Sequence, residues 1–217
     1  MTGLEEHGAL AAIDGTALKF QDAIARAGLP DKAPFEEWSQ QILIDHPELK
    51  ALVLPAGTVV EGDLHLDHDA EPFATKGAGC VVGLGDLTIT GRIVNSDEES
   101  GPFLLVAGNL KAKELVAAAS GIVVLGSVVV DGLILCDGVN GALLVGGDLK
   151  SATLIDCDHE ILVAGDVDAR VASDDLGNMR DLLVPDVFED PADPANEWPE
   201  GHLIRERLLQ GLPIFKT

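Results

Sequence analysis

The chain has 217 residues, which is enough for one domain with a sizeable hydrophobic core. Its 14 Lys and Arg against 37 Asp and Glu give a net charge of −23, which excludes nucleic-acid binding because too few cations are available to neutralise phosphates. The same charge opposes contact with an anionic membrane, so a partner selected by charge is expected to be a basic protein. Hydrophobic residues make up 47% of the chain, which indicates a folded protein.

Residues 1–50 are predicted to form a helical cap. Apolar side chains recur at helical spacing in two stretches, 16–28 and 34–46, and glycine or proline ends each stretch. The apolar positions are Phe20, Ile24, Ala27, Phe35, Trp38 and Ile42. These faces need a surface to cover, and the first coil of the repeat that follows is expected to supply it.

A repeat occupies residues 51–172. Six short aliphatic and β-branched runs each end in a glycine followed by a small polar residue, and these glycines are Gly62, Gly85, Gly108, Gly126, Gly147 and Gly165. Such short runs between glycines indicate strands rather than helices. One unit alone buries no apolar surface, so successive units must stack. The sequence therefore predicts an all-β solenoid, a right-handed parallel β-helix of about six coils.

Counting from each glycine predicts the interior of this β-helix. The second residue after each glycine forms one expected ladder: Leu64, Leu87, Leu110, Val128, Leu149 and Val167. The eighth residue forms a second: Ile93, Val116, Ile134 and Ile155. The tenth position holds small residues, and this register places Cys136 and Cys157 in neighbouring coils.

The two cysteines and the hand of the helix leave alternatives open. A disulfide between Cys136 and Cys157 is geometrically conceivable, and two inert buried thiols are the simpler alternative. A left-handed helix of the hexapeptide acyltransferase type is the alternative to the right-handed form. Such helices repeat an apolar residue every six positions in coils of near-constant length. The glycines here are unevenly spaced, which favours the right-handed form.

Residues 173–217 are predicted to be an irregular acidic segment that packs on the solenoid. Acids and prolines dominate its first part, but apolar residues are interspersed among them. Residues 201–212 have the pattern of a final amphipathic helix. Like the helices at the other end, this segment is expected to act as a cap.

Eight acidic residues are the candidate partner-binding residues. Four follow glycines of the repeat directly, namely Asp63, Asp86, Asp148 and Asp166. Four lie in the C-terminal segment, namely Asp186, Glu189, Asp190 and Asp193. The first four have an alternative interpretation, because Asp and Asn at turns commonly bond to nearby backbone.

Neither a metal site nor a catalytic site is predicted. The alternating His and Asp of residues 63–69 suit a divalent metal, but no second ligand group is identifiable, so no metal and no cofactor is assigned. The chain has no Tyr and two Trp, both outside the repeat, so the aromatic platforms of β-helical carbohydrate enzymes are missing. Phosphate-loop, GxSxG and HExxH motifs are also missing, and we expect a protein that is not an enzyme.

The sequence indicates a cytoplasmic location. The three cysteines form no zinc-type spacing, which suits a reducing compartment. The first residues carry acids where a signal peptide carries Lys or Arg. The longest uncharged stretch, 115–130, is too short for a membrane-spanning helix.

The repeat resembles that of bactofilins, bacterial cytoskeletal proteins that form polymers. The residues that carry the resemblance are the GDLTITG of 85–91 and the GDLHL of 62–66. The resemblance covers residues 55–172 and implies a β-helical core that polymerises end to end. The two terminal segments depart from that plan, because caps block the edge addition that a filament needs.

Three functions follow as expectations. The first is an acidic binding module, monomeric or a small homo-oligomer, that engages a basic protein; an immunity protein that neutralises a basic toxin is the most concrete example. The second is a bactofilin-like scaffold that self-assembles. The third is a carbohydrate-active enzyme.

Overall fold

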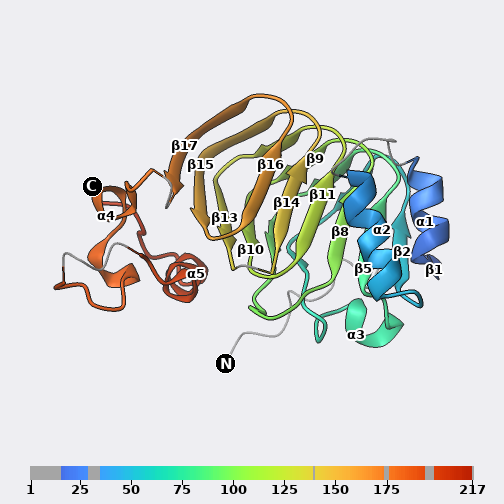
Figure 1. Cartoon of the computed structure of the whole chain (residues 1–217), viewed down its shortest axis with the longest axis horizontal. Helices are drawn as coiled ribbons and strands as arrows, with labels where there is room; N and C mark the ends of the chain where they lie inside the picture. The colour runs from blue at the N-terminus through green and yellow to red at the C-terminus, as the bar shows by residue number, and fades with distance from the viewer. Residues whose placement is uncertain (1–15, 29–34, 139, 174–175, 194–197, 217) are drawn as a thin grey trace.

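The computed structural model describes residues 16–28, 35–138, 140–173, 176–193 and 198–216. Its main body is a parallel β-solenoid, seen in Figure 1 as a stack of coils. Three faces surround the interior. The chain makes about five full turns, and the six expected coils correspond to the six parallel strands of the first face.

The first face is a seven-stranded sheet. Its parallel strands are β2 (Lys50–Leu54), β5 (Cys80–Gly83), β8 (Phe103–Val106), β11 (Gly121–Val124), β14 (Ala142–Val145) and β16 (Glu160–Val163). The seventh strand, β1 (Thr16–Lys19), pairs antiparallel with β2 and closes this edge of the sheet. At the other edge, β16 is the last strand.

The other two faces form one folded sheet. The second face contains β3 (Thr58–Val60), β6 (Leu87–Ile89), β9 (Leu110–Ala112) and β12 (Val128–Val130). The third face contains β4 (Leu64–His65), β7 (Arg92–Val94), β10 (Glu114–Ala117) and β13 (Leu133–Asp137). Two long strands, β15 (Leu149–Cys157) and β17 (Val167–Ser173), run across both faces and join them.

The N-terminal helices cover the side of the solenoid rather than its end. Figure 1 shows α1 (Phe20–Ala27) and α2 (Phe35–Asp45) beside the first face. Phe20 and Ile42 pack with outward-facing residues of that sheet, among them Val82 and Leu105. A short helix, α3 (Phe73–Lys76), instead places Phe73 against the interior at the first coil. The expected helical cap is therefore a lateral cover.

The C-terminal segment covers the third face. It contains α4 (Met179–Leu182), a 3-10 helix η1 (Pro185–Val187) and α5 (Gly201–Leu209). Phe188 and Ile204 pack with outward-facing residues of the strands beneath, including Leu135 and Ile155. The segment thus lies on a side of the solenoid and leaves the edge of β16 uncovered by the described residues.

The first expected interior ladder is confirmed from its second member onward. Strand pairing aligns Leu87 with Leu110, then Val128, Leu149 and Val167. Leu64 was assigned wrongly, because it pairs with Ile93 on the third face. The residue under Leu87 is Thr58.

The second expected ladder was half wrong. The aligned interior residues are Leu64, Ile93, Leu115, Ile134, Leu154 and Val171. Val116 and Ile155 are the neighbours of two of these and point outward, where the C-terminal segment buries them. Cys136 and Cys157 are not aligned either, because Cys136 pairs with Asp156 and faces the interior, whereas Cys157 faces outward. All three cysteines are buried, and none of them forms a disulfide bond.

The corner glycines of the repeat stack with their backbones in close contact. The N–H of Gly126 donates to the carbonyl of Gly108, one coil earlier, at 3.0 Å. A Cβ atom on Gly126 would lie 2.7 Å from that carbonyl oxygen and 2.5 Å from Oδ1 of Asn109. No side chain fits there, which explains why glycine recurs at this corner.

Gly126→Ala is expected to lower the free energy of unfolding by about 1–3 kcal/mol, because the added methyl group must displace backbone of the preceding coil. Gly83→Ala is the matched control, since a Cβ atom there meets its nearest neighbour at an ordinary 3.7 Å. Urea denaturation of the two variants measures the difference. Equal stability of both variants would contradict the close stacking.

Candidate interaction surface

A ladder of polar side chains links the coils at the corner between the first and second faces. The backbone N–H of Asn109 donates to Oδ1 of Asp86 at 2.8 Å, and that of Ser127 donates to Oδ1 of Asn109 at 2.9 Å. The N–H of Asp148 donates to Oγ of Ser127 at 3.0 Å, and that of Asp166 donates to Oδ1 of Asp148 at 3.0 Å. Each side chain thus accepts a backbone hydrogen bond from the next coil rather than from the nearby backbone that the alternative interpretation named.

Asp166 is the last member of this corner ladder. Its side chain is exposed, and within the described ranges no later coil donates an N–H to its carboxylate. Asp86 and Asp148 are exposed as well, so all three keep a negative charge at the surface.

Asp63 was grouped wrongly with these residues. It lies at the next corner, between the second and third faces, where its Oδ1 accepts the backbone N–H of Arg92 at 2.7 Å. Its Oδ2 accepts Nε of Arg92 at 3.1 Å and forms an ion pair with Nη2 at 3.0 Å. Asp63 therefore joins two coils through a partly buried ion pair.

The C-terminal acids lie on the third face, away from the corner ladder. Asp186 forms an ion pair with Arg207 at 2.8 Å. Oδ1 of Asp190 accepts the N–H of Ala192 at 3.0 Å. Glu189 and Asp193 are exposed, as are the other two acids. The structure therefore separates the eight candidate residues into two surfaces and one inter-coil contact.

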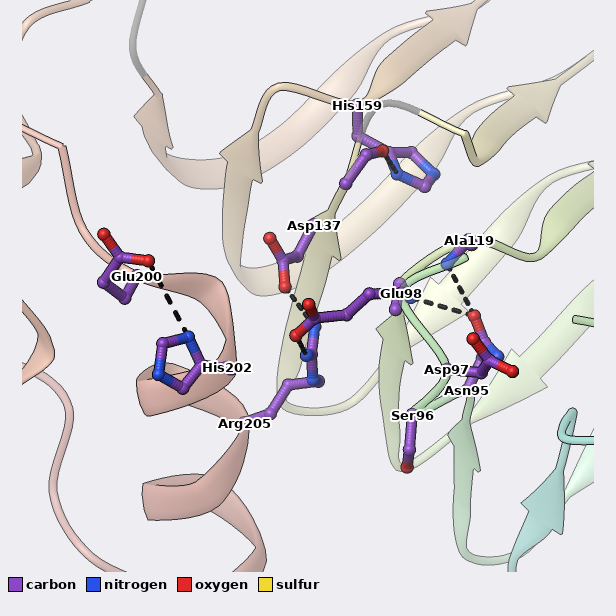
Figure 2. A network of polar contacts seen from close by, with 12 residues as sticks. Asn95, Ser96, Asp97, Glu98, Ala119, Asp137, His159, Glu200, His202 and Arg205 are labelled. Atoms are coloured by element: carbon purple, nitrogen blue, oxygen red, sulfur yellow. Dashed lines mark hydrogen bonds and ion pairs between the residues drawn. The ribbon is translucent and has the colours of Figure 1, made fainter. Parts of the chain in front are cut away.

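A buried asparagine, at the tenth position after Gly85, where the sequence predicts only a small residue, holds the third corner together. Asn95 has no exposed surface. Its Nδ2 donates to the carbonyl of Leu66 at 2.9 Å, and its Oδ1 accepts the backbone N–H groups of Ala119 at 2.7 Å and Ser120 at 2.8 Å. Figure 2 shows the bond to Ala119. One amide thus satisfies polar groups of the preceding and following coils.

A buried ion pair fastens α5 to the third face. Arg205, whose side chain is 7% exposed, donates to the carboxylates of Asp137 and Glu98 (Figure 2). Burial raises the pKa of the Asp137 carboxyl, and the nearby guanidinium of Arg205 partly opposes that shift. The three residues are far apart in the sequence, so no local pattern marks them.

His159 lies buried beneath the turn that follows β13. Its Nδ1 lies 3.0 Å from the carbonyl oxygen of Gly138 (Figure 2). Burial lowers the pKa of His159, because desolvation disfavours the imidazolium more strongly than the nearby carbonyl favours it.

The contribution of His159 to the melting temperature is expected to fall as the pH is lowered from 7.5 to 5.5. His159 stays neutral in the folded protein to a lower pH than in the unfolded chain, so unfolding takes up a proton below about pH 6.5. The stability that neutral His159 contributes is therefore lost on acidification. Differential scanning fluorimetry of His159→Gln should show a smaller fall than wild type, whereas the exposed control His46→Gln should match wild type. An unchanged slope in His159→Gln would exclude this residue as the cause.

The described residues contain no group of three or more His, Cys, Asp or Glu side chains placed to hold a metal ion. Two of the alternating residues 63–69, Asp63 and Asp67, instead bond to backbone of the following coil. Oδ1 of Asp67, for example, accepts the backbone N–H of Ser96 at 2.7 Å. Among the described helices, none is long and apolar enough to cross a membrane.

Comparison with known proteins adds no assignment to these surfaces. We found no protein family model, no curated protein and no solved structure that matches this chain.

Proposed function

We propose that this protein is a non-enzymatic acidic binding module whose partner is a basic protein. The observation that carries the proposal is the exposed negative charge on a rigid scaffold. Corner-ladder acids line one edge of the solenoid, C-terminal acids cover another side, and the chain as a whole has a net charge of −23. A fixed array of this kind favours fast, salt-sensitive association with a cationic surface. An immunity-type protein that neutralises a basic toxin is the most concrete form of such a module.

Affinity capture from the native cell lysate, followed by reconstitution with the purified partner, tests the proposal. The partner should be basic, and its association rate should fall steeply between low salt and about 1 M salt, where the Debye length is about 3 Å. The test variant is the full chain with four exposed acids neutralised together, namely Asp186→Asn, Glu189→Gln, Asp190→Asn and Asp193→Asn. It should bind the partner more weakly than wild type. A complex that is unaltered at high salt and in this variant counts against selection by charge.

A self-assembling scaffold is the second candidate, because one observation favours it. The C-terminal segment packs on β17, where Asn178 bonds to the backbone of Val171 and Ser173, but among the described residues it leaves the edge of β16 uncovered, so edge addition remains sterically open on the first face of the last coil. Light scattering distinguishes the two candidates. Large assemblies that persist at high salt would support the scaffold, and a discrete monomer or small oligomer would support the binding module.

A further inference from the structure

The two ends of the solenoid differ in how well their interiors are covered. At the first coil the interior residues Leu52, Leu54 and Leu64 have no exposed surface. At the last coil Val167, which continues the interior ladder of Leu149, is 47% exposed. Ile161 and Val163 of β16, which also face the interior, are only partly buried. The last coil therefore presents an apolar strip that a further strand would cover.

The backbone of β16 is also open for pairing. Among the described residues, β16 pairs only with β14. The N–H of Ala164 points toward the preceding strand, β14, and donates to the carbonyl of Val145 at 2.9 Å. Because neighbouring N–H groups of a strand point in opposite directions, the N–H of Val163 points to the free edge. The carboxylate of Asp166, the last member of the corner ladder, is also available as an acceptor. Every earlier member of that ladder accepts an N–H from the following coil, so Asp166 could accept one from an added strand.

Charge indicates what covers this edge. The exposed residues around it include Glu160, Asp166 and Asp168, and Asp168 already forms an ion pair with Lys150 at 3.0 Å. A second copy of the chain docked on this end would bring the same acids face to face. Its opposite end cannot accept β16 in parallel register either, because β1 occupies that edge of the sheet. A cationic segment fits both the charge and the open edge.

We propose that the last coil is completed by an extended, basic segment of the partner protein, which adds a strand beside β16. Along β16 its apolar side chains alternate inward over Ile161 and Val163, and its Lys or Arg side chains point outward near Glu160. Beyond the corner at Gly165 the segment continues over Val167, near Asp168. Its backbone continues the sheet, as in β-augmentation. This inference rests on the proposed function and names the surface by which the module binds.

A synthetic peptide of alternating Val and Lys, about eight residues long, is the probe for this edge. Its control has the same composition with the Val and Lys residues in separate blocks, so its charge is equal but it cannot present one apolar face. Fluorescence anisotropy with the full chain at about 50 mM salt should show tighter binding of the alternating peptide.

Two variants assign the binding to β16. Val163→Pro removes the N–H that points to the free edge of β16. The fold should survive, because Pro is tolerated where the N–H of an edge strand has no partner strand. Val167→Lys places a cation on the apolar strip at a position that is already 47% exposed. Each variant is expected to weaken binding of the alternating peptide about tenfold, with unchanged circular dichroism.

Three other outcomes are possible, and each would contradict either the edge inference or the proposed function. Equal binding of both peptides, unaffected by either variant, would overturn the edge inference but leave an acidic binding module. Failure of both peptides to bind would count against the proposed function itself. A wild-type dimer that Val163→Pro dissociates in light scattering would show that a second copy occupies the edge, and would overturn the inference.

Discussion

Replacing Ile134 by aspartate is expected to unfold the solenoid. Ile134 has no exposed surface and lies in the interior between Leu115 of the preceding coil and Leu154 of the following coil. No cation or hydrogen-bond donor is aligned with it in the ladder, so a carboxylate there would be buried without a partner. The expected cost is about 4–5 kcal/mol, a large share of the about 5–15 kcal/mol that stabilises a typical domain.

The control for this substitution is Val129→Asp on the second face. Val129 points outward, is 37% exposed, and pairs with Lys111 on one side and Lys150 on the other. An aspartate there lies between two cations, so wild-type stability or a slight increase is expected. Circular dichroism and urea denaturation compare the two variants. A soluble Ile134→Asp protein with the wild-type unfolding midpoint would refute the interior register.

The regular part of the repeat could be predicted from the sequence because equivalent corners recur at similar spacing. The ladder residues that follow Gly85, Gly108, Gly126 and Gly147 align as expected. Counting from the glycine failed in the first coil, where it assigned Leu64 to the wrong ladder, because Gly62 lies at a different corner and stacks under Gly91. Asp63 and Arg92, which bond between these corners, are 29 residues apart, whereas later coils have 18 to 23. The segment that contains α3 supplies the additional residues.

The second ladder failed for a different physical reason. Val116 and Ile155 are apolar although they point outward, because the C-terminal segment buries the outer side of the third face. A strand that is buried on both sides loses the alternation of apolar and polar residues, so the inward side chains cannot be selected by pattern.

The sequence could predict that turn acids bond to backbone groups, but not which groups they bond to. Turn acids that bond to backbone were one of the two interpretations of Asp86 and Asp148, but which backbone groups they accept from depends on the coil register. The contact of Arg205 with Asp137 spans 68 residues, and its contact with Glu98 spans 107. Such long-range pairs leave no spacing in the sequence by which to find them.

The Arg205→Met variant is expected to lose about 3–5 kcal/mol at pH 7, because it leaves the carboxylate of Asp137 buried without its cation. The side chain of Asp137 is 15% exposed, whereas that of Glu98 is 61% exposed and regains water. Chemical denaturation measures the loss. Lys150→Met is the matched control: it breaks an exposed ion pair with Asp168, so little change is expected.

Two further measurements separate an unpaired charge from lost packing in Arg205→Met. The double variant Asp137→Leu with Arg205→Met should recover most of the stability, because an apolar pair of similar volume replaces the ion pair. Burial without Arg205 also keeps the pKa of Asp137 raised, so the folded variant takes up a proton at a higher pH than the unfolded chain. Protonation then stabilises the fold, and the deficit relative to wild type should shrink as the pH is lowered from 7 to 5. If the deficit is the same at both pH values and in the double variant, Arg205 holds α5 through the packing of its side chain rather than through its charge.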